Sequence, residues 1–144
     1  MSSPEKHGHS TIITGHRYKD APAAIEWLCK VFGFERHAVY EGPDGTIGHA
    51  ELTLGGGMIM LGSGKDDEFG RSFKSPEELG GVETCSLYIV VPDADAAYAR
   101  AGSAGAVITT PLHDTPYGSR DFTVKDPEGH TWNVGTYDPW GKHE

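Results

Sequence analysis

The sequence has 144 residues, of which 37% are hydrophobic and 23% are charged, a composition that fits one globular domain and excludes an intrinsically disordered chain. Because 21 Asp and Glu outnumber 12 Lys and Arg, the net charge is −9, which disfavours nucleic acid and anionic membrane surfaces as partners. No apolar run approaches the ~20 residues of a membrane-spanning helix, and two cysteines are too few for a disulfide framework. We expect a cytoplasmic protein; a neutral or cationic small ligand is compatible with the charge, although acidity of this size also serves solubility alone.

The first half of the chain predicts a strand, a helix and three further strands. After a strand at residues 10–18, Asp20 is a typical helix N-cap, and Gly33 is a typical helix stop. Apolar residues at i, i+3, i+4 and i+7 give this helix one buried face: Ile25, Leu28, Cys29 and Phe32. The three strands that follow are expected at residues 34–40, 46–54 and 58–61.

The second half repeats this order. A strand at residues 84–91 precedes a helix capped by Asp93 or Asp95, then a strand that begins at 107–109 and a hairpin of strands 119–125 and 130–136. One offset of 73 residues relates the halves, since it carries Asp20 to Asp93, Ile25 to Tyr98 and Gly56 to Gly129. The fold class is therefore α+β, with two packed β-α-β-β-β modules.

The expected organisation follows from these repeats. Charge and glycine mark a connector between the modules, and Ser75-Pro76-Glu77-Glu78 has the form of a capping box that starts a short helix within it. The expected divisions are a flexible N-terminus at 1–9, the first module at 10–62, the connector at 63–81, the second module at 82–137 and a C-terminal tail at 138–144.

The two modules, with Tyr117-Gly118-Ser119-Arg120 ahead of Asp126-Pro127-Glu128-Gly129, resemble the vicinal oxygen chelate superfamily. That group includes glyoxalase I, extradiol dioxygenases, fosfomycin-resistance enzymes and bleomycin-resistance proteins. Residues 48–52 followed by 58–61 are most similar to its bleomycin-resistance-like and PhnB-like branch. The resemblance implies a curved, mixed-sheet cup with helices outside, a cavity on the cup face and a homodimer.

Enzymes of the superfamily hold a divalent metal on the cup face. Aligned through the helix caps and glycine turns, the four corresponding positions here are Ile13, Met60, Ser86 and Asn133. None of the four is a histidine or a carboxylate, which are the side chains that such metals prefer. The expectation is therefore a protein without the metal of the family, and no cofactor is expected.

The cup face is predicted from strand alternation, because residues two apart share a face. A regular hairpin about residues 126–129 places Phe122 opposite Asn133, and the same pairing shifted by 73 places His49 opposite Met60. The expected ligand-binding residues are Arg17, His49, Glu51, Met60, Tyr88, Arg120, Phe122 and Asn133, with Met58 beside them. His49 and Glu51 could instead form a simple hydrogen-bonded pair, and Arg17 and Arg120 could form internal ion pairs with Glu51.

Two functions from different classes are open at this stage. The first is a metal-free binding protein of the bleomycin-resistance type that sequesters an organic ligand or drug in the cup. The second is a metal-dependent glyoxalase-like lyase or isomerase, or an extradiol-type dioxygenase. An enzyme of that kind would need relocated metal ligands, such as His49, Glu51 and His113. The catalytic residues of this alternative, and the identity of the ligand, stay unassigned.

Overall fold

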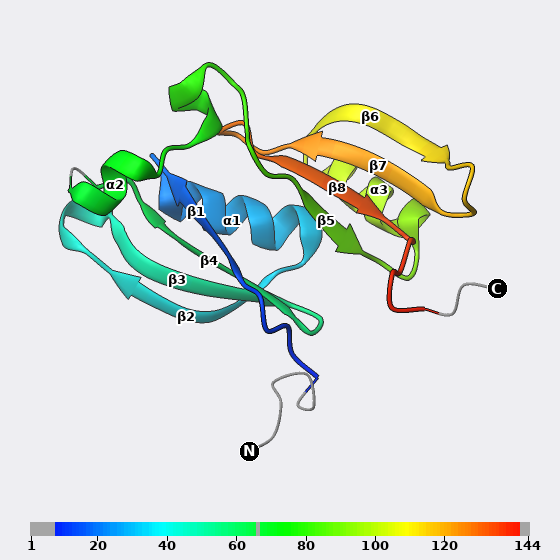
Figure 1. The fold of residues 1–144 in the computed structure, drawn as a ribbon, viewed down its shortest axis with the longest axis horizontal. Coiled ribbons are helices and arrows are strands. Elements are labelled where there is room, and N and C mark those ends of the chain that lie inside the picture. Colours follow the sequence, from blue (N-terminus) through cyan, green and yellow to red (C-terminus); the bar gives the residue numbers. More distant parts are fainter. Residues whose placement is uncertain (1–7, 66, 142–144) are drawn as a thin grey trace.

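Each half of the chain forms a four-stranded mixed sheet with one long helix, as the computed structural model of residues 8–65 and 67–141 shows (Figure 1). The elements of the first module are β1 (Thr14–Tyr18), α1 (Ala21–Phe32), β2 (Glu35–Glu41), the 3₁₀ turn η2 (Pro43–Gly45), β3 (Ile47–Leu54) and β4 (Gly57–Ser63). Those of the second are β5 (Leu87–Val90), α3 (Ala94–Ser103), β6 (Val107–Asp114), β7 (Arg120–Lys125) and β8 (Thr131–Gly135). The connector holds α2 (Glu68–Ser72) and the 3₁₀ turn η3 (Pro76–Leu79).

The two sheets have the same strand order. It is β1-β4-β3-β2 in the first sheet and β5-β8-β7-β6 in the second, with the outer strands β1 and β5 parallel to their neighbours and the other pairs antiparallel. The expected α+β class with two β-α-β-β-β modules is therefore confirmed.

The helix boundaries follow the predicted caps. The Asp20 carboxylate accepts a hydrogen bond from the amide of Ala23, and Gly33 ends α1 in the left-handed conformation at φ 87°, where a side chain would be strained. In the second module Asp93, not Asp95, is the N-cap of α3. The predicted capping box of Ser75 and Glu78 is present at η3, whereas the five-residue helix α2 was not expected.

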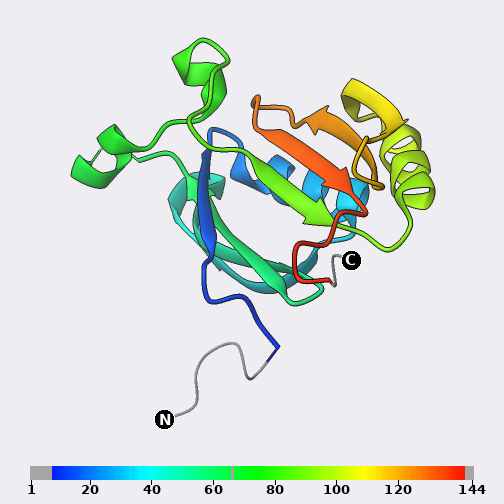
Figure 2. The same cartoon turned by 45° about the vertical axis from the view of Figure 1, so that its right-hand side comes forward.

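One hydrophobic core joins the modules. Helix α1 packs on β1, β3 and β4, helix α3 packs on β6, β7 and β8, and the two helices contact each other; Figure 2 shows α1 behind the first sheet and α3 at the outer edge of the second. The largest fully buried side chains include Trp132, Tyr18, Phe122, Leu28 and Leu52. Each sheet thus has one face against its helix and one open face.

The register of the second hairpin corrects one prediction. Phe122 pairs with Val134, and Thr123 pairs with Asn133, so the predicted pairing of Phe122 with Asn133 is wrong by one residue. The cause is the turn, in which the amide of Asp126 bonds the carbonyl of His130 and Gly129 adopts φ 91°, which adds one residue to the expected four. A slip of one residue moves a side chain to the other face, and Phe122 is fully buried against Tyr98 of α3.

Most of the N-terminus expected at 1–9 and part of the tail expected at 138–144 lie outside the described residues. Among the helices that the structure describes, none has the length and apolar character needed to span a membrane.

Candidate functional site

The open face of the first sheet carries four of the predicted site residues. Strand pairing places Gly15 of β1 and Glu51 of β3 on either side of Met60 in β4. Arg17 and His49, two residues along their strands, share this face. Met60 therefore pairs with Glu51 and not with His49, a shift of two residues that leaves the predicted face unchanged.

A hollow of about 230 Å³ lies on this face. It is lined by Gly15, His16, Arg17, Gly48, His49, Met60, Leu61 and Phe73. Gly15 has open space in front of it, with no atom within 4 Å of the position that a Cβ would occupy. The strand backbone at Gly15 therefore forms a flat floor, and Met60 and Phe73 supply apolar walls, a combination that suits a flat organic group. We call this the sheet A pocket.

A histidine–carboxylate pair lies at the edge of the sheet A pocket. The Nε2–H of His49 donates to Glu51 Oε2 at 3.0 Å, and His37 Nε2 lies 4.0 Å from Glu51 Oε1. The ring of Tyr40 stacks on that of His49 at 6.1 Å. Of the two alternatives for His49 and Glu51, the structure therefore has the hydrogen-bonded pair.

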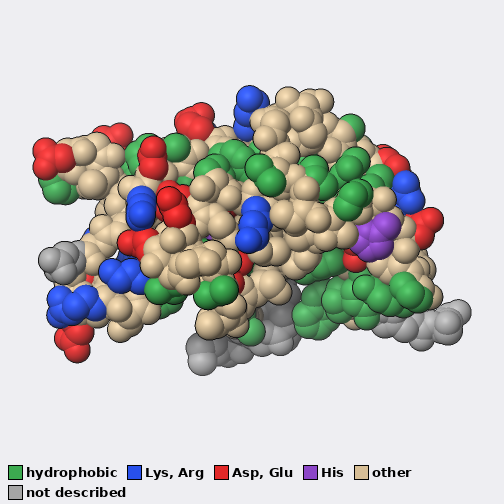
Figure 3. Space-filling model, turned by 90° about the horizontal axis from the view of Figure 1, so that it is seen from above, with side chains coloured by type: hydrophobic (Ala, Val, Ile, Leu, Met, Phe, Trp, Pro, Cys, Tyr) green, Lys and Arg blue, Asp and Glu red, His purple; other side chains and the backbone are tan. Residues whose placement is uncertain are grey.

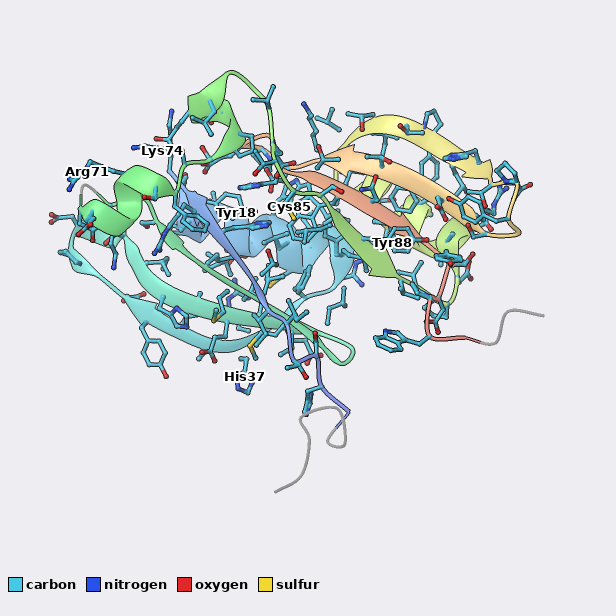
Figure 4. All side chains as sticks on the ribbon, in the orientation of Figure 1. Tyr18, His37, Arg71, Lys74, Cys85 and Tyr88 are labelled. Carbon is cyan, nitrogen blue, oxygen red and sulfur yellow. The ribbon has the colours of Figure 1, made fainter. Side chains whose placement is uncertain are left out.

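His37 was missed by the sequence reasoning because its position depends on a β-bulge. The pairing of β2 with β3 shifts register between Arg36 and Ala38, and a bulge of this kind redirects a side chain. Figure 4 shows His37 at the outer side of the first sheet, away from α1. No simple alternation could have placed it beside Glu51.

The positions that correspond to the metal site of the family do not fit a divalent metal. Ile13 and Ser86 lie just before β1 and β5 and are exposed. The Asn133 amide is already used, since Oδ1 accepts from the Thr123 hydroxyl at 3.0 Å and Nδ2 donates to the Leu87 carbonyl at 3.0 Å. Met60 offers only a soft thioether.

The residues considered as alternative metal ligands, His49, Glu51 and His113, do not all lie together either. His113 belongs to β6 of the second sheet, where its Nδ1 lies 2.9 Å from the carbonyl of Pro111. His49 and Glu51 lie on the first sheet. Within residues 8–65 and 67–141, no three His, Cys, Asp or Glu side chains are grouped closely enough to hold a metal ion.

The remaining predicted residues lie on the second module. Tyr88 and Asn133, paired across β5 and β8, lie on the open face of the second sheet. Arg120, at the start of β7, pairs with Asp114 at 2.9 Å and with Asp95 at 3.4 Å, and both carboxylates are mostly exposed. Arg120 is therefore paired with Asp114 and Asp95, and the alternative of an internal ion pair between Arg120 and Glu51 is wrong. The structure brings Arg17, His49 and Met60 together in one pocket, and it leaves Tyr88, Asn133 and Arg120 apart from them.

A buried polar junction connects the modules, and the sequence reasoning recognised only its turn. Asp126 Oδ2 accepts from the Tyr18 hydroxyl at 2.7 Å and from the Trp132 Nε1–H at 3.1 Å. Asp126 Oδ1 accepts from the amides of Glu128 and His130, both at 3.0 Å. Burial, together with the charge of Asp126, raises the pKa of Tyr18, so that its hydroxyl remains a donor.

Two histidines complete the junction. The ring of His16 stacks on that of His130 with centroids 4.2 Å apart, and Glu83 accepts a hydrogen bond from His130 Nδ1 at 2.9 Å. Burial, with a smaller contribution from His130, lowers the pKa of His16 to about 3. The backbone amides of Lys19 and Asp20 donate to Glu128. The turn at 126–130 thus holds the start of α1 and the end of β1.

Two β-α-β-β-β modules that share one core and leave an open, pocket-bearing sheet face define a glyoxalase-type fold. The family model of the Glyoxalase/Bleomycin resistance protein/Dioxygenase superfamily matches residues 13–134. The chain belongs to this superfamily.

Relatives of known sequence and structure agree with this membership. Uncharacterized protein Mb0911c of Mycobacterium bovis is 36% identical over 116 residues, which are 81% of this chain and 76% of that protein. The crystal structure of TioX from Micromonospora sp. ML1 is similar with a TM-score of 0.69 and 34% identity, over 88% of this chain and 97% of TioX. The fosfomycin resistance protein FosX from Mesorhizobium loti shares the fold, with a TM-score of 0.63 and 16% identity over 90% of this chain and 93% of FosX.

Proposed function

We propose that this protein binds a small organic molecule in the sheet A pocket and does so without a metal ion. The observation that carries the proposal is the open, glycine-floored hollow beside Met60 and Phe73, on the sheet face where the superfamily resemblance puts its cavity. The chemistry of Ile13, Met60 and Asn133 supports metal-free binding, because these side chains are poor ligands for a divalent metal.

The sheet A pocket is large enough to enclose only part of a ligand. Its volume of about 230 Å³ is small beside the roughly 300–1,000 Å³ of pockets that enclose a drug-sized molecule. It therefore receives one flat group of the ligand, with apolar contact from Met60 and Phe73 and polar contact from Arg17 and His49. We propose that binding of this kind serves sequestration of the ligand.

Filling the pocket with a side chain tests the proposal. In Gly15→Leu the new side chain occupies the open space without strain, because nothing lies within 4 Å of its Cβ and Gly15 does not have a positive φ. We expect the affinity for the fluorescent probe anilinonaphthalene sulfonate to fall at least about tenfold, while the melting temperature stays near that of the wild type. A fluorescence titration measures the affinity, with and without a chelator, and the chelator is expected to change nothing.

Gly102→Leu is the matched control. Gly102 is exposed in α3, and it also has nothing within 4 Å of its Cβ position. It should bind the probe as the wild type does. Equal affinities of Gly15→Leu and the wild type, or loss of binding on chelation, would overturn the proposal.

We further propose a homodimer in solution. Each chain leaves one open face on each of two separate sheets, and a second copy would cover the part of the ligand that the small pocket leaves exposed. Light scattering at micromolar concentration should give a mass near twice the 15.5 kDa of the chain. A mass of one chain at every concentration would refute the dimer and leave the pocket proposal to its own test.

A further inference from the structure

On the open face of the second sheet, the carboxylate of Asp121 meets the hydroxyl of Tyr88 above Gly135. Tyr88 of β5 and Asp121 of β7 lie on either side of β8, and the Tyr88 hydroxyl donates to Asp121 Oδ1 at 3.1 Å. Their meeting point lies over Gly135, where a Cβ would collide with both side chains. Only glycine at this position lets Asp121 and Tyr88 approach each other across β8. Asp121 was absent from the predicted site because the one-residue register error placed Phe122 on this face.

Among the residues that the structure describes, Asp121 has no cationic partner. Its Oδ1 also accepts from the Ser119 hydroxyl at 3.1 Å. Among the described residues, no Lys, Arg or His side chain forms an ion pair with Asp121, and Oδ2 receives no hydrogen bond. The neighbouring Arg120 is directed to Asp114 and Asp95 instead. A half-buried carboxylate of this kind attracts a positive charge from outside the chain.

Three tyrosines form a chain of contacts that begins at this carboxylate. Tyr88 is 38% exposed and Tyr137 is 36% exposed, and the amide of Tyr137 donates to the Tyr88 hydroxyl at 3.0 Å. The ring of Tyr117 packs edge-on against that of Tyr137 at 5.5 Å. Figure 4 labels Tyr88, the second residue of β5. Figure 3 shows hydrophobic side chains gathered at the lower right of that view. The faces of tyrosine rings attract cations, and quaternary ammonium groups are recognised in this way.

We propose that the open face of the second sheet binds a small organic cation of the alkylammonium class, with Asp121 as its counter-ion and Tyr88, Tyr117 and Tyr137 as its aromatic wall. This site is distinct from the sheet A pocket and does not depend on it. The net charge of −9 adds a long-range attraction for the same class of ligand. Burial and the nearby carboxylate raise the pKa of Tyr88 to about 12, which keeps its hydroxyl bonded to Asp121 at neutral pH.

Choline and its uncharged carbon isostere are the probes for this site. In an NMR titration we expect choline to bind the wild type at least about tenfold more tightly than the isostere does. Asp121→Asn should weaken choline binding at least about tenfold, and Asp121→Glu should restore most of it. Asp114→Asn, which changes the net charge equally at an exposed carboxylate, should bind choline as the wild type does.

If Asp121→Asn does not fold, a second variant, at the exposed ring of Tyr117, tests the same proposal. Tyr117 is 65% exposed, so Tyr117→Leu should fold and should bind choline about threefold more weakly. Equal binding of choline and the isostere, or equal losses in Asp121→Asn and Asp114→Asn, would overturn the proposal. One further outcome would overturn the proposal: Asp121→Asn lowers the mass of the protein in solution and leaves choline binding unchanged. That result would mean that a cationic side chain of a second copy of the chain, and not a small cation, pairs with Asp121. Gly15→Leu should leave choline binding unchanged, which separates this result from the test of the sheet A pocket.

Discussion

Replacing Asp126 by alanine should destabilise the protein by about 4 kcal/mol or more. The carboxylate is buried, and it accepts hydrogen bonds from the Tyr18 hydroxyl, the Trp132 indole and two backbone amides. Without it, the four donors of this buried junction have no acceptor, and each buried, unpaired donor costs about 1–3 kcal/mol. The lost free energy is comparable with the whole stability of a domain, about 5–15 kcal/mol. Urea denaturation measures the effect.

Two further variants serve as comparisons for the stability of Asp126→Ala. Tyr18→Phe removes one of the four donors and should cost about 1.5 kcal/mol. Asp114→Ala removes an exposed carboxylate of the same module and should leave the urea midpoint almost unchanged. If Asp126→Ala were as stable as Asp114→Ala, the junction would not hold the modules together.

Acidification should weaken the same junction through His16. The pKa of His16 is about 3 in the folded protein and 6.5 without burial. Between these values the unfolded chain binds the proton and the folded chain does not, so stability falls as the pH falls below 6.5. At pH 4.5, two pH units at about 1.36 kcal/mol each amount to a loss of about 3 kcal/mol. Nothing is lost from this source above pH 6.5.

The groups that face His16 explain the shift. It stacks on His130, packs edge-on to Trp132, and its Nδ1 lies 3.3 Å from the Tyr18 hydroxyl. The Tyr18 hydroxyl donates to Asp126 and can accept a hydrogen bond from the His16 Nδ1–H. Burial is the larger cause of the lowered pKa of His16, and the neighbouring His130 is the smaller one. Urea melts at pH 7 and pH 4.5 should differ by about 3 kcal/mol less in His16→Phe than in the wild type. His113→Gln, a change at an exposed histidine, should keep the wild-type difference, and a His16→Phe protein with that same difference would contradict this account.

The repeat made the fold predictable, while the turns limited the prediction of the site. Helix caps such as Asp20 and Asp93 are local signals and gave the correct positions. The offset of 73 carries the pair Gly15–Met60 of the first sheet to the pair Tyr88–Asn133 of the second. Met60 also pairs with Glu51, and Asn133 also pairs with Thr123. Glu51 and Thr123 are only 72 residues apart, because the turn after β7 is one residue longer than the turn after β3. That single residue moved Phe122 into the core and left Asp121 and Thr123 on the open face.

Other features depend on contacts that no local pattern encodes. Tyr18 and Asp126 are 108 residues apart in the chain and meet only because the modules pack. The bulge that brings His37 near Glu51 leaves no mark in the alternation of β2. The separation of Met60 from Tyr88 follows from two sheets that each use one face for the shared core.

The most direct test of ligand binding by the first sheet is an amide NMR titration of the wild-type protein with anilinonaphthalene sulfonate. The shifted signals should be concentrated at the residues that form the floor and walls of the sheet A pocket: Gly15, Arg17, Gly48, His49 and Met60. The signal of Asp126, which lies in the junction and outside the pocket lining, should not move. A titration in which these pocket amides stay fixed while the probe binds elsewhere, or does not bind, would contradict the central claim.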